Sequence, residues 1–230
     1  MKFAVIGDLV GSRSHDSRRH VQESLVSALA TAGELVESLQ ELEPTIGDEF
    51  QSVHADLHDA LLATVLVRLA LPEHLDARCG IGVGPIEIVG ASAYGLTQDG
   101  PAWWAAREAI DEVKGAQRTM PYLRTRIRRP DHADGDLAQA YLECRDHIVS
   151  TFDGRQRRIA LGVISGRTAA QIADDEGISA SAVSQRTRSS GIRALTESVK
   201  HVPAGVPDWG HLPAGSAVGC MGDGRQEAER

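Results

Sequence analysis

The chain has 230 residues, a formal net charge of −8 at pH 7 and 42% hydrophobic residues, enough for one large core and a second, smaller one. Its three cysteines, Cys79, Cys144 and Cys220, lie far apart, which excludes a disulfide framework and a zinc site of the usual spacing. No apolar run approaches the ~18 residues of a membrane span, and the apolar stretch before Asp8 is too short for a signal peptide. We therefore expect a cytoplasmic protein with no membrane partner.

Hydrophobic periodicity predicts a front domain over residues 1–130. In chain order it indicates a buried strand at Lys2–Ile6, a helix at Arg18–Leu42, a hairpin at Pro44–Val53, a helix at His54–Leu71, a strand at Arg78–Val89 and a helix at Asp99–Lys114. The order β-α-ββ-α-β-α predicts an α+β fold with a ferredoxin-like split βαβ sheet and helices on one face. The segment LRTRIRR, residues 123–129, favours an exposed edge strand with a solvated basic face, and a phosphate clamp is the alternative.

The rest of the chain is predicted to be mostly helical. Residues 131–152 are expected to form a linking helix, and residues 153–200 an all-α domain of three helices. Residues 201–230 are rich in Gly, Pro and Ala without periodicity, so we expect a mostly disordered tail.

The last two of these helices have the signals of a helix-turn-helix. Thr168 is placed to cap a helix that Gly177 ends, and Ser179 is placed to cap the next helix. The two helices would be held together by apolar residues, namely Ile172, Ala173, Ile178, Val183, Ile192 and Leu195. This spacing predicts a compact DNA-binding motif.

The second helix of the pair would enter the major groove. The polar residues predicted to face DNA are Ser181, Ser184, Gln185, Arg186 and Arg188. Arg157, with Arg155 and Arg158, begins the preceding helix and is predicted to contact phosphates. The alternative is a small helical subdomain with a polar face, or a protein-interaction module.

The charge distribution agrees with DNA as the partner of the back domain. Residues 1–120 carry 9 Lys and Arg against 18 Asp and Glu, whereas residues 150–200 carry 8 against 5. An acidic front domain joined to a mildly basic one is typical of a regulator with a separate sensing or catalytic part. The basic excess is small, so one copy would bind DNA weakly, and we expect a homodimer.

Acidic residues mark a candidate metal site in the front domain. Asp8 follows the first predicted strand, and Asp48 and Glu49 lie at the hairpin turn. These segments are neighbours in a split βαβ sheet, so the carboxylates would converge, and Mg²⁺ or Mn²⁺ would relieve their repulsion and orient a triphosphate. Ser12 and Arg13 would bind phosphate at the start of the first helix. The alternative is that Asp8 and Asp48 are ordinary turn residues.

Two further patterns leave alternatives open. Gly80, Gly82 and Gly84 lie within a predicted strand, which indicates either close backbone packing or close approach of a ligand. Trp103 and Trp104 are expected to serve as a core residue and a packing anchor, with base stacking as the alternative.

Four blocks, GDLVGSR, TIGDEFQ, RCGIGVGPIEIVG and DGPAWWAARE, resemble the SatD-like family of bacterial proteins. In the same order they are similar to class III nucleotidyl cyclases and, through GDEF, to diguanylate cyclase palm domains. The back domain resembles LuxR-type and sigma-factor region 4 helix-turn-helix domains. The resemblance implies metal binding by Asp8 and Asp48, nucleotide contacts from Gly47 and Arg107, and a transition-state role for Arg107 if the chain is active.

The chain also departs from the cyclase pattern. Trp103 stands where cyclases have an asparagine that orients the ribose, and Trp cannot replace its hydrogen bonds. Ile46 replaces the first glycine of the diguanylate cyclase motif, and no lysine matches the one that reads the base. The departures favour a transcriptional regulator that binds DNA and senses a nucleoside triphosphate or related nucleotide. The alternative is an active metal-dependent nucleotidyl transferase or cyclase.

Overall fold

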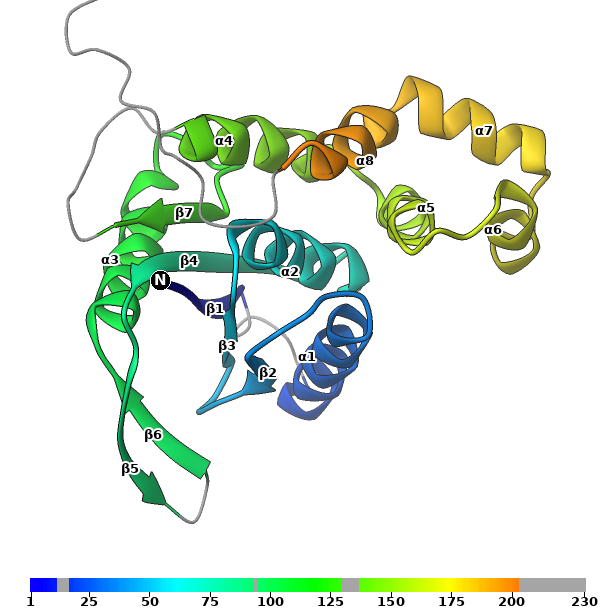
Figure 1. Ribbon diagram of the computed structural model, residues 1–230. Coiled ribbons are helices and arrows are strands. Elements are labelled where there is room, and N and C mark those ends of the chain that lie inside the picture. The colour runs from blue at the N-terminus through cyan, green and yellow to red at the C-terminus, as the bar shows by residue number, and fades with distance from the viewer. Residues whose placement is uncertain (12–16, 93–94, 130–136, 203–230) are drawn as a thin grey trace, which may run out of the picture.

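The computed structural model describes residues 1–11, 17–92, 95–129 and 137–202. A five-stranded mixed sheet with helices is followed by an all-helical C-terminal region, which confirms the α+β class (Figure 1). Within the described residues, no helix is long and apolar enough to cross a membrane. The tail segment 203–230 lies outside the described residues.

The sheet has the strand order β2-β3-β1-β4-β7. Its strands are β1 (Lys2–Val10), β2 (Gln40–Pro44), β3 (Glu49–His54), β4 (Asp76–Gly84) and β7 (Thr125–Arg128). Neighbours are antiparallel except β4 and β7, which are parallel. The first strand is longer than predicted, so Asp8 lies inside β1, opposite Glu49 of β3 and Arg78 of β4.

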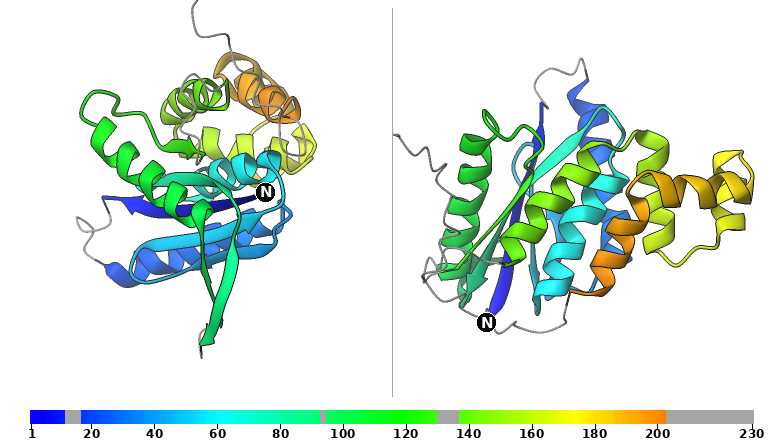
Figure 2. Two further views of the ribbon diagram at one scale, coloured as in Figure 1. Left: turned by 60° about the vertical axis from the view of Figure 1, so that its left-hand side comes forward. Right: turned by 90° about the horizontal axis from the view of Figure 1, so that it is seen from above.

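Helices cover both faces of the sheet, so the expectation of helices on one face is wrong (Figure 2). Helices α1 (Arg18–Gly33) and α2 (Leu57–Ala70) pack on the face that carries Phe3 and Val5. Helix α3 (Pro101–Ala116) packs on the opposite face.

Two glycines of β4 allow α3 to lie against the strand. A Cβ on Gly82 would be 1.9 Å from the Ala102 carbonyl oxygen, and one on Gly80 would be 2.2 Å from the Ala106 carbonyl oxygen. The glycine pattern therefore serves close backbone packing, and its close neighbour is a helix of this chain.

The predicted helix at Arg18–Leu42 and the predicted strand at Arg78–Val89 are both shorter in the structure. The helix predicted at Arg18–Leu42 ends at Gly33, and the Leu39 N–H donates to the Val53 carbonyl at 2.7 Å, which begins the pairing of β2 with β3. The strand predicted at Arg78–Val89 is interrupted at Pro85, which has no N–H to donate. Beyond it, β5 (Glu87–Ser92) pairs with β6 (Gly95–Asp99) in a hairpin that projects from the body (Figure 1).

Strand β7 is the predicted edge strand, but its arginines do not form a solvated basic face. Arg126 of the strand pairs with Glu143 and Arg128 with Glu112, and Arg124, just before the strand, pairs with Asp76. The alternation of apolar and charged residues within 123–129 predicted the strand. The acidic partners of its arginines come from α3, α4 and β4, so the sequence of this segment alone could not predict them.

The helical region contains α4 (Leu137–Ser150), α5 (Gly154–Ile164), α6 (Ala169–Glu176), α7 (Ala180–Ser189) and α8 (Ile192–Lys200). Thr168 and Ser179 cap α6 and α7 as predicted, and Gly177 ends α6 in the left-handed conformation with φ 62°. Four helices lie within residues 154–200 instead of the three expected, because Gly191, with φ 81°, separates α7 from α8.

The helical region shares its core with the sheet. Buried residues from α4, α5 and α8, among them Leu142, Ile159 and Leu195, belong to the same cluster as Phe3 and Val5. Helix α4, expected as a linker, is part of this core. The back region is therefore packed on the front region.

Charged residues are buried at this junction. We call Arg68, Asp76, Arg124, Arg145 and Asp146 the Arg68 cluster; they come from α2, β4, α4 and the segment before β7. Arg68 Nε donates to Asp76 Oδ1 at 2.8 Å, and Arg68 Nη1 donates to Asp146 Oδ1 at 2.9 Å. The cluster joins the sheet to α4, because each carboxylate accepts from more than one arginine.

Candidate functional site

The sheet face beneath α3 carries two adjacent sets of ion pairs. Asp8, only 7% exposed, accepts from Arg78 Nε at 2.8 Å through Oδ1 and lies 3.1 Å from Lys114 Nζ through Oδ2. On the next strand, both carboxylate oxygens of Glu49 accept from Arg107, at 3.1 and 3.2 Å. Three cations and two carboxylates thus meet at one end of the sheet.

The predicted metal ligands lie near one another along the backbone. Leu9 N–H donates to the Asp48 carbonyl at 3.2 Å, and Asp8 is opposite Glu49 in the register. Across the described ranges, however, no group of three or more His, Cys, Asp or Glu side chains is arranged to hold a metal ion. Both oxygens of Asp8 are already occupied by the protein's own cations. The arrangement as it stands does not fit a metal ion, and metal binding remains a prediction.

The role of Lys114 was missed by sequence reasoning. Lys114 lies seven residues after Arg107 on α3. That spacing puts both side chains on one helix face, a signal that indicates a shared site.

The described residues do not test the other predicted phosphate ligands. Ser12 and Arg13 lie outside the described part of the chain. Gly47 is in the hairpin turn between β2 and β3, with φ 76° and open space where a Cβ would be. Its conformation explains the glycine, because L side chains rarely adopt it.

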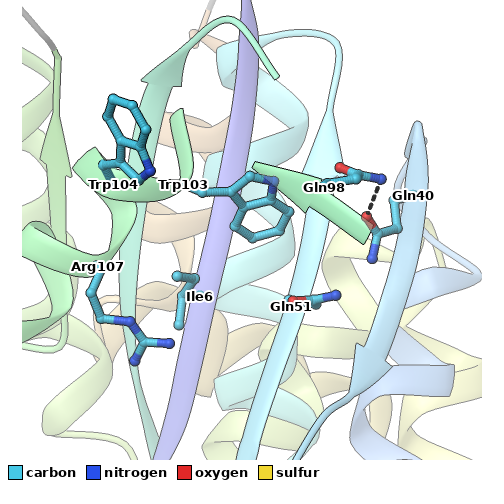
Figure 3. A pocket seen from close by; sticks show the side chains of 7 residues that line it. All are labelled: Ile6, Gln40, Gln51, Gln98, Trp103, Trp104 and Arg107. Atoms are coloured by element: carbon cyan, nitrogen blue, oxygen red, sulfur yellow. Dashed lines mark hydrogen bonds between the residues drawn. The ribbon is translucent and has the colours of Figure 1, made fainter. Parts of the chain in front are cut away.

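A pocket of about 530 Å³ lies next to Arg107, between α3, the sheet and β6 (Figure 3). It is lined by Ile6, Gln40, Gln51, Gln98, Trp103, Trp104 and Arg107. Trp103 is half-buried and packs on the small core formed by α3 and β1. Trp104 is 60% exposed and donates from Nε1 to Asp99 Oδ1 at 2.8 Å, so it is not a core residue.

The second candidate site is the outer surface of α7, at the end of the helical region farthest from the sheet (Figure 1). Ser181, Gln185 and Arg188 are exposed there, and Ser184 and Arg186 are partly exposed. Among the described residues, neither Arg186 nor Arg188 takes part in an ion pair. These two cations are therefore available to an anionic partner.

The predicted phosphate contacts on α5 are placed differently. Arg157 is only 6% exposed, and its Nη1 donates to the Leu75 carbonyl at 2.9 Å, so it is inside the molecule. Arg155 and Arg158 both pair with Glu176 of α6. Tertiary packing of α5 on α2 explains the difference, and we do not retain Arg157 as a phosphate contact.

The fold and these two surfaces define an α+β protein with a charged, pocketed sheet face and a separate helix that exposes arginines. The profile of the SatD family matches residues 2–201, and the chain belongs to that family. No curated protein matches the chain.

Proposed function

We propose that the chain is a cytoplasmic, DNA-binding transcriptional regulator whose front region binds a nucleotide. In this proposal α6 and α7 are a helix-turn-helix of the LuxR or sigma region 4 kind. The split βαβ part of the sheet is a ferredoxin-like, cyclase-like sensor. The observation that carries the proposal is the exposed, unpaired arginine surface of α7.

The local geometry of α6 and α7 suits this role. Ile172 and Ala173 of α6 and Val183 of α7 are buried, so the two helices pack through their apolar sides. The left-handed Gly177 makes the connection short. The opposite side of α7 then presents Gln185 and Arg188, and the partly exposed Arg186 lies at its edge. Gln and Arg side chains can make bidentate contacts to adenine and guanine.

The charged sheet end supports a phosphate ligand. Arg78, Lys114 and Arg107 are held together there by Asp8 and Glu49. A triphosphate would attract these three cations and draw them from the carboxylates. Asp8, with Asp48 and Glu49 on the neighbouring hairpin, would then offer oxygen ligands to Mg²⁺ or Mn²⁺. We therefore expect metal binding only together with the nucleotide, and Asp8→Asn should abolish it in calorimetry with Mn²⁺ and a non-hydrolysable triphosphate.

DNA binding is tested with the full chain, since α5 is packed against the front region. Binding-site selection on random duplexes should yield an enriched motif, and a homodimer should yield paired half-sites about 10 base pairs apart. Arg186→Ala should lose preference at particular bases, by about 1–3 kcal/mol for each bidentate pair removed.

Arg19→Ala is the matched control, because it removes the same charge from an exposed position on α1. It should leave the selected motif unchanged. If selection yields no motif, and Arg186→Ala retains DNA as wild type does, α7 is a protein-interaction surface and the regulator proposal is wrong.

An active nucleotidyl transferase or cyclase is the second candidate. Arg107 favours this candidate. Its ion pair with Glu49 places it at the same end of the sheet as Asp8. Release of pyrophosphate from a nucleoside triphosphate in the presence of Mn²⁺, lost in Arg107→Ala, would favour the enzyme. Trp103 at the position of the ribose-orienting asparagine predicts that a cyclic product is absent.

A further inference from the structure

We propose that the pocket beside Arg107 binds a nucleobase, which stacks on Trp103 and is read by the amides of Gln40, Gln51 and Gln98. The inference rests on the proposal that the front region binds a nucleotide, and it names the residues that would recognise the base. The pocket volume of about 530 Å³ is within the range of sites for small organic ligands.

The pocket offers a flat apolar surface. Figure 3 shows the Trp103 indole reaching from α3 over the sheet toward Gln98, with Ile6 of β1 beside it. Base stacking on an aromatic ring is favourable for every base, because every base has a π-face. The Trp103 Nε1 is buried and makes no hydrogen bond with any described residue, so the indole offers the pocket its ring and no hydrogen-bond donor.

Three amide side chains surround this surface. Gln98 Nε2 donates to Gln40 Oε1 at 2.9 Å, which joins β6 to the edge strand β2 and leaves Gln98 Oε1 and Gln40 Nε2 for a ligand. The Gln51 side chain makes no hydrogen bond within the described residues. An amide supplies both a donor and an acceptor, as the edges of nucleobases require.

The pocket also lies at a distance from the charged sheet end that one nucleotide could span. Ile6 lines the pocket and Asp8 lies two residues further along β1, about 7 Å away in an extended strand. That distance suits a ribose between a base at Ile6 and phosphates near Arg78 and Lys114. The lining contains no carboxylate, and Arg107 both lines the pocket and pairs with Glu49, so it connects the pocket to the charged sheet end.

The test measures binding of ATP, GTP, CTP, UTP and inorganic tripolyphosphate to the full chain, by calorimetry and by quenching of tryptophan fluorescence. At least one nucleotide should bind more tightly than tripolyphosphate. Trp103→Leu should weaken that nucleotide about tenfold or more, while Trp103→Phe, which keeps a stacking ring, should retain most of the affinity. Gln51→Leu should change the ranking of the four nucleotides without changing the affinity for tripolyphosphate.

Gln22→Leu is the matched control, because it makes the same chemical change on α1, on the other side of the sheet, and should change nothing. Equal affinity for nucleotides and tripolyphosphate, or wild-type nucleotide binding by both Trp103→Leu and Gln51→Leu in folded protein, overturns the base pocket while leaving a phosphate-sensing regulator intact. Failure of every nucleotide and of tripolyphosphate to bind removes the nucleotide sensor itself, and this inference with it.

Discussion

Replacing Arg68 with methionine tests what the buried charges contribute to the junction between the two regions. The Arg68 side chain is 0% exposed and pairs with Asp76 and with Asp146, whose side chain is also 0% exposed. The substitution keeps most of the side-chain volume but removes the guanidinium that pairs with the Asp76 and Asp146 carboxylates. Breaking a buried pair by removing one member costs about 3–5 kcal/mol, so we expect a loss of that size in the free energy of unfolding.

The pH dependence of stability gives an independent measure. Burial by itself would raise the pKa of Asp76, but Arg68 and Arg124 outweigh it and lower this pKa from 3.8 to about 2. Because the folded-state pKa is depressed, the stabilisation is present above pH 4 and is lost as the pH falls toward 2. A shift of this size corresponds to about 2.5 kcal/mol. In Arg68→Met the burial effect is less opposed and the folded-state pKa of Asp76 is higher, so this loss should be smaller and should be complete at a higher pH.

Urea unfolding of the full chain, followed by circular dichroism at pH 7 and at intervals down to pH 2, measures both effects. Arg19→Met is the matched control, since the Arg19–Glu23 pair has side chains 86% and 57% exposed and should be worth well under about 1 kcal/mol. The reasoning is refuted if Arg68→Met loses no more stability than Arg19→Met, or if both variants have the acid profile of wild type.

Two further predictions concern the sheet and its surroundings. Gly82→Ala should lower the free energy of unfolding by about 1–3 kcal/mol, because the added Cβ would meet the backbone of α3. Gly33→Ala is the control and should not be destabilising, because nothing lies within 4 Å of its Cβ. Thermal unfolding of both variants measures the difference. Burial lowers the pKa of His54, which bonds to the Glu37 carbonyl and Ser52 Oγ, so stability should fall as the pH drops below about 6.5. His54→Gln should flatten that slope in urea titrations at pH 7.5 and 5.5, and an unchanged slope would contradict the assignment.

Elements specified by local signals were predictable from the sequence. The caps at Thr168 and Ser179 and the glycine at Gly177 act within one turn of the chain, so residue type and spacing sufficed to place α6 and α7. The hairpin around Gly47 was predicted for the same reason. The prediction that Ile172, Val183 and Leu195 are core residues is confirmed, because helical periodicity records which face is apolar.

The errors come from interactions between segments distant in sequence. Arg157 has the appearance of a phosphate ligand in the sequence, but it binds carbonyls of Leu75 and Arg68, more than eighty residues earlier. Gly80 and Gly82 showed that something approaches β4 closely, but residue spacing could not show that it is α3. The predicted single strand Arg78–Val89 was wrong because alternation continues across Pro85 while the strand changes its partner.

The continuous core restricts how the proposed regulator would couple its two surfaces. Helix α4 contributes Arg145 and Asp146 to the Arg68 cluster and Leu142 and Val149 to the common core, so the helical region is held against the sheet. A ligand can change DNA affinity only by the difference in its own affinity for two arrangements of the protein. Here those arrangements must differ in packed contacts, because buried residues of α4 belong to the same core as the sheet. The buried charges of the Arg68 cluster favour one such arrangement over another, because they are paired in only one geometry and leaving a buried charge unpaired is costly.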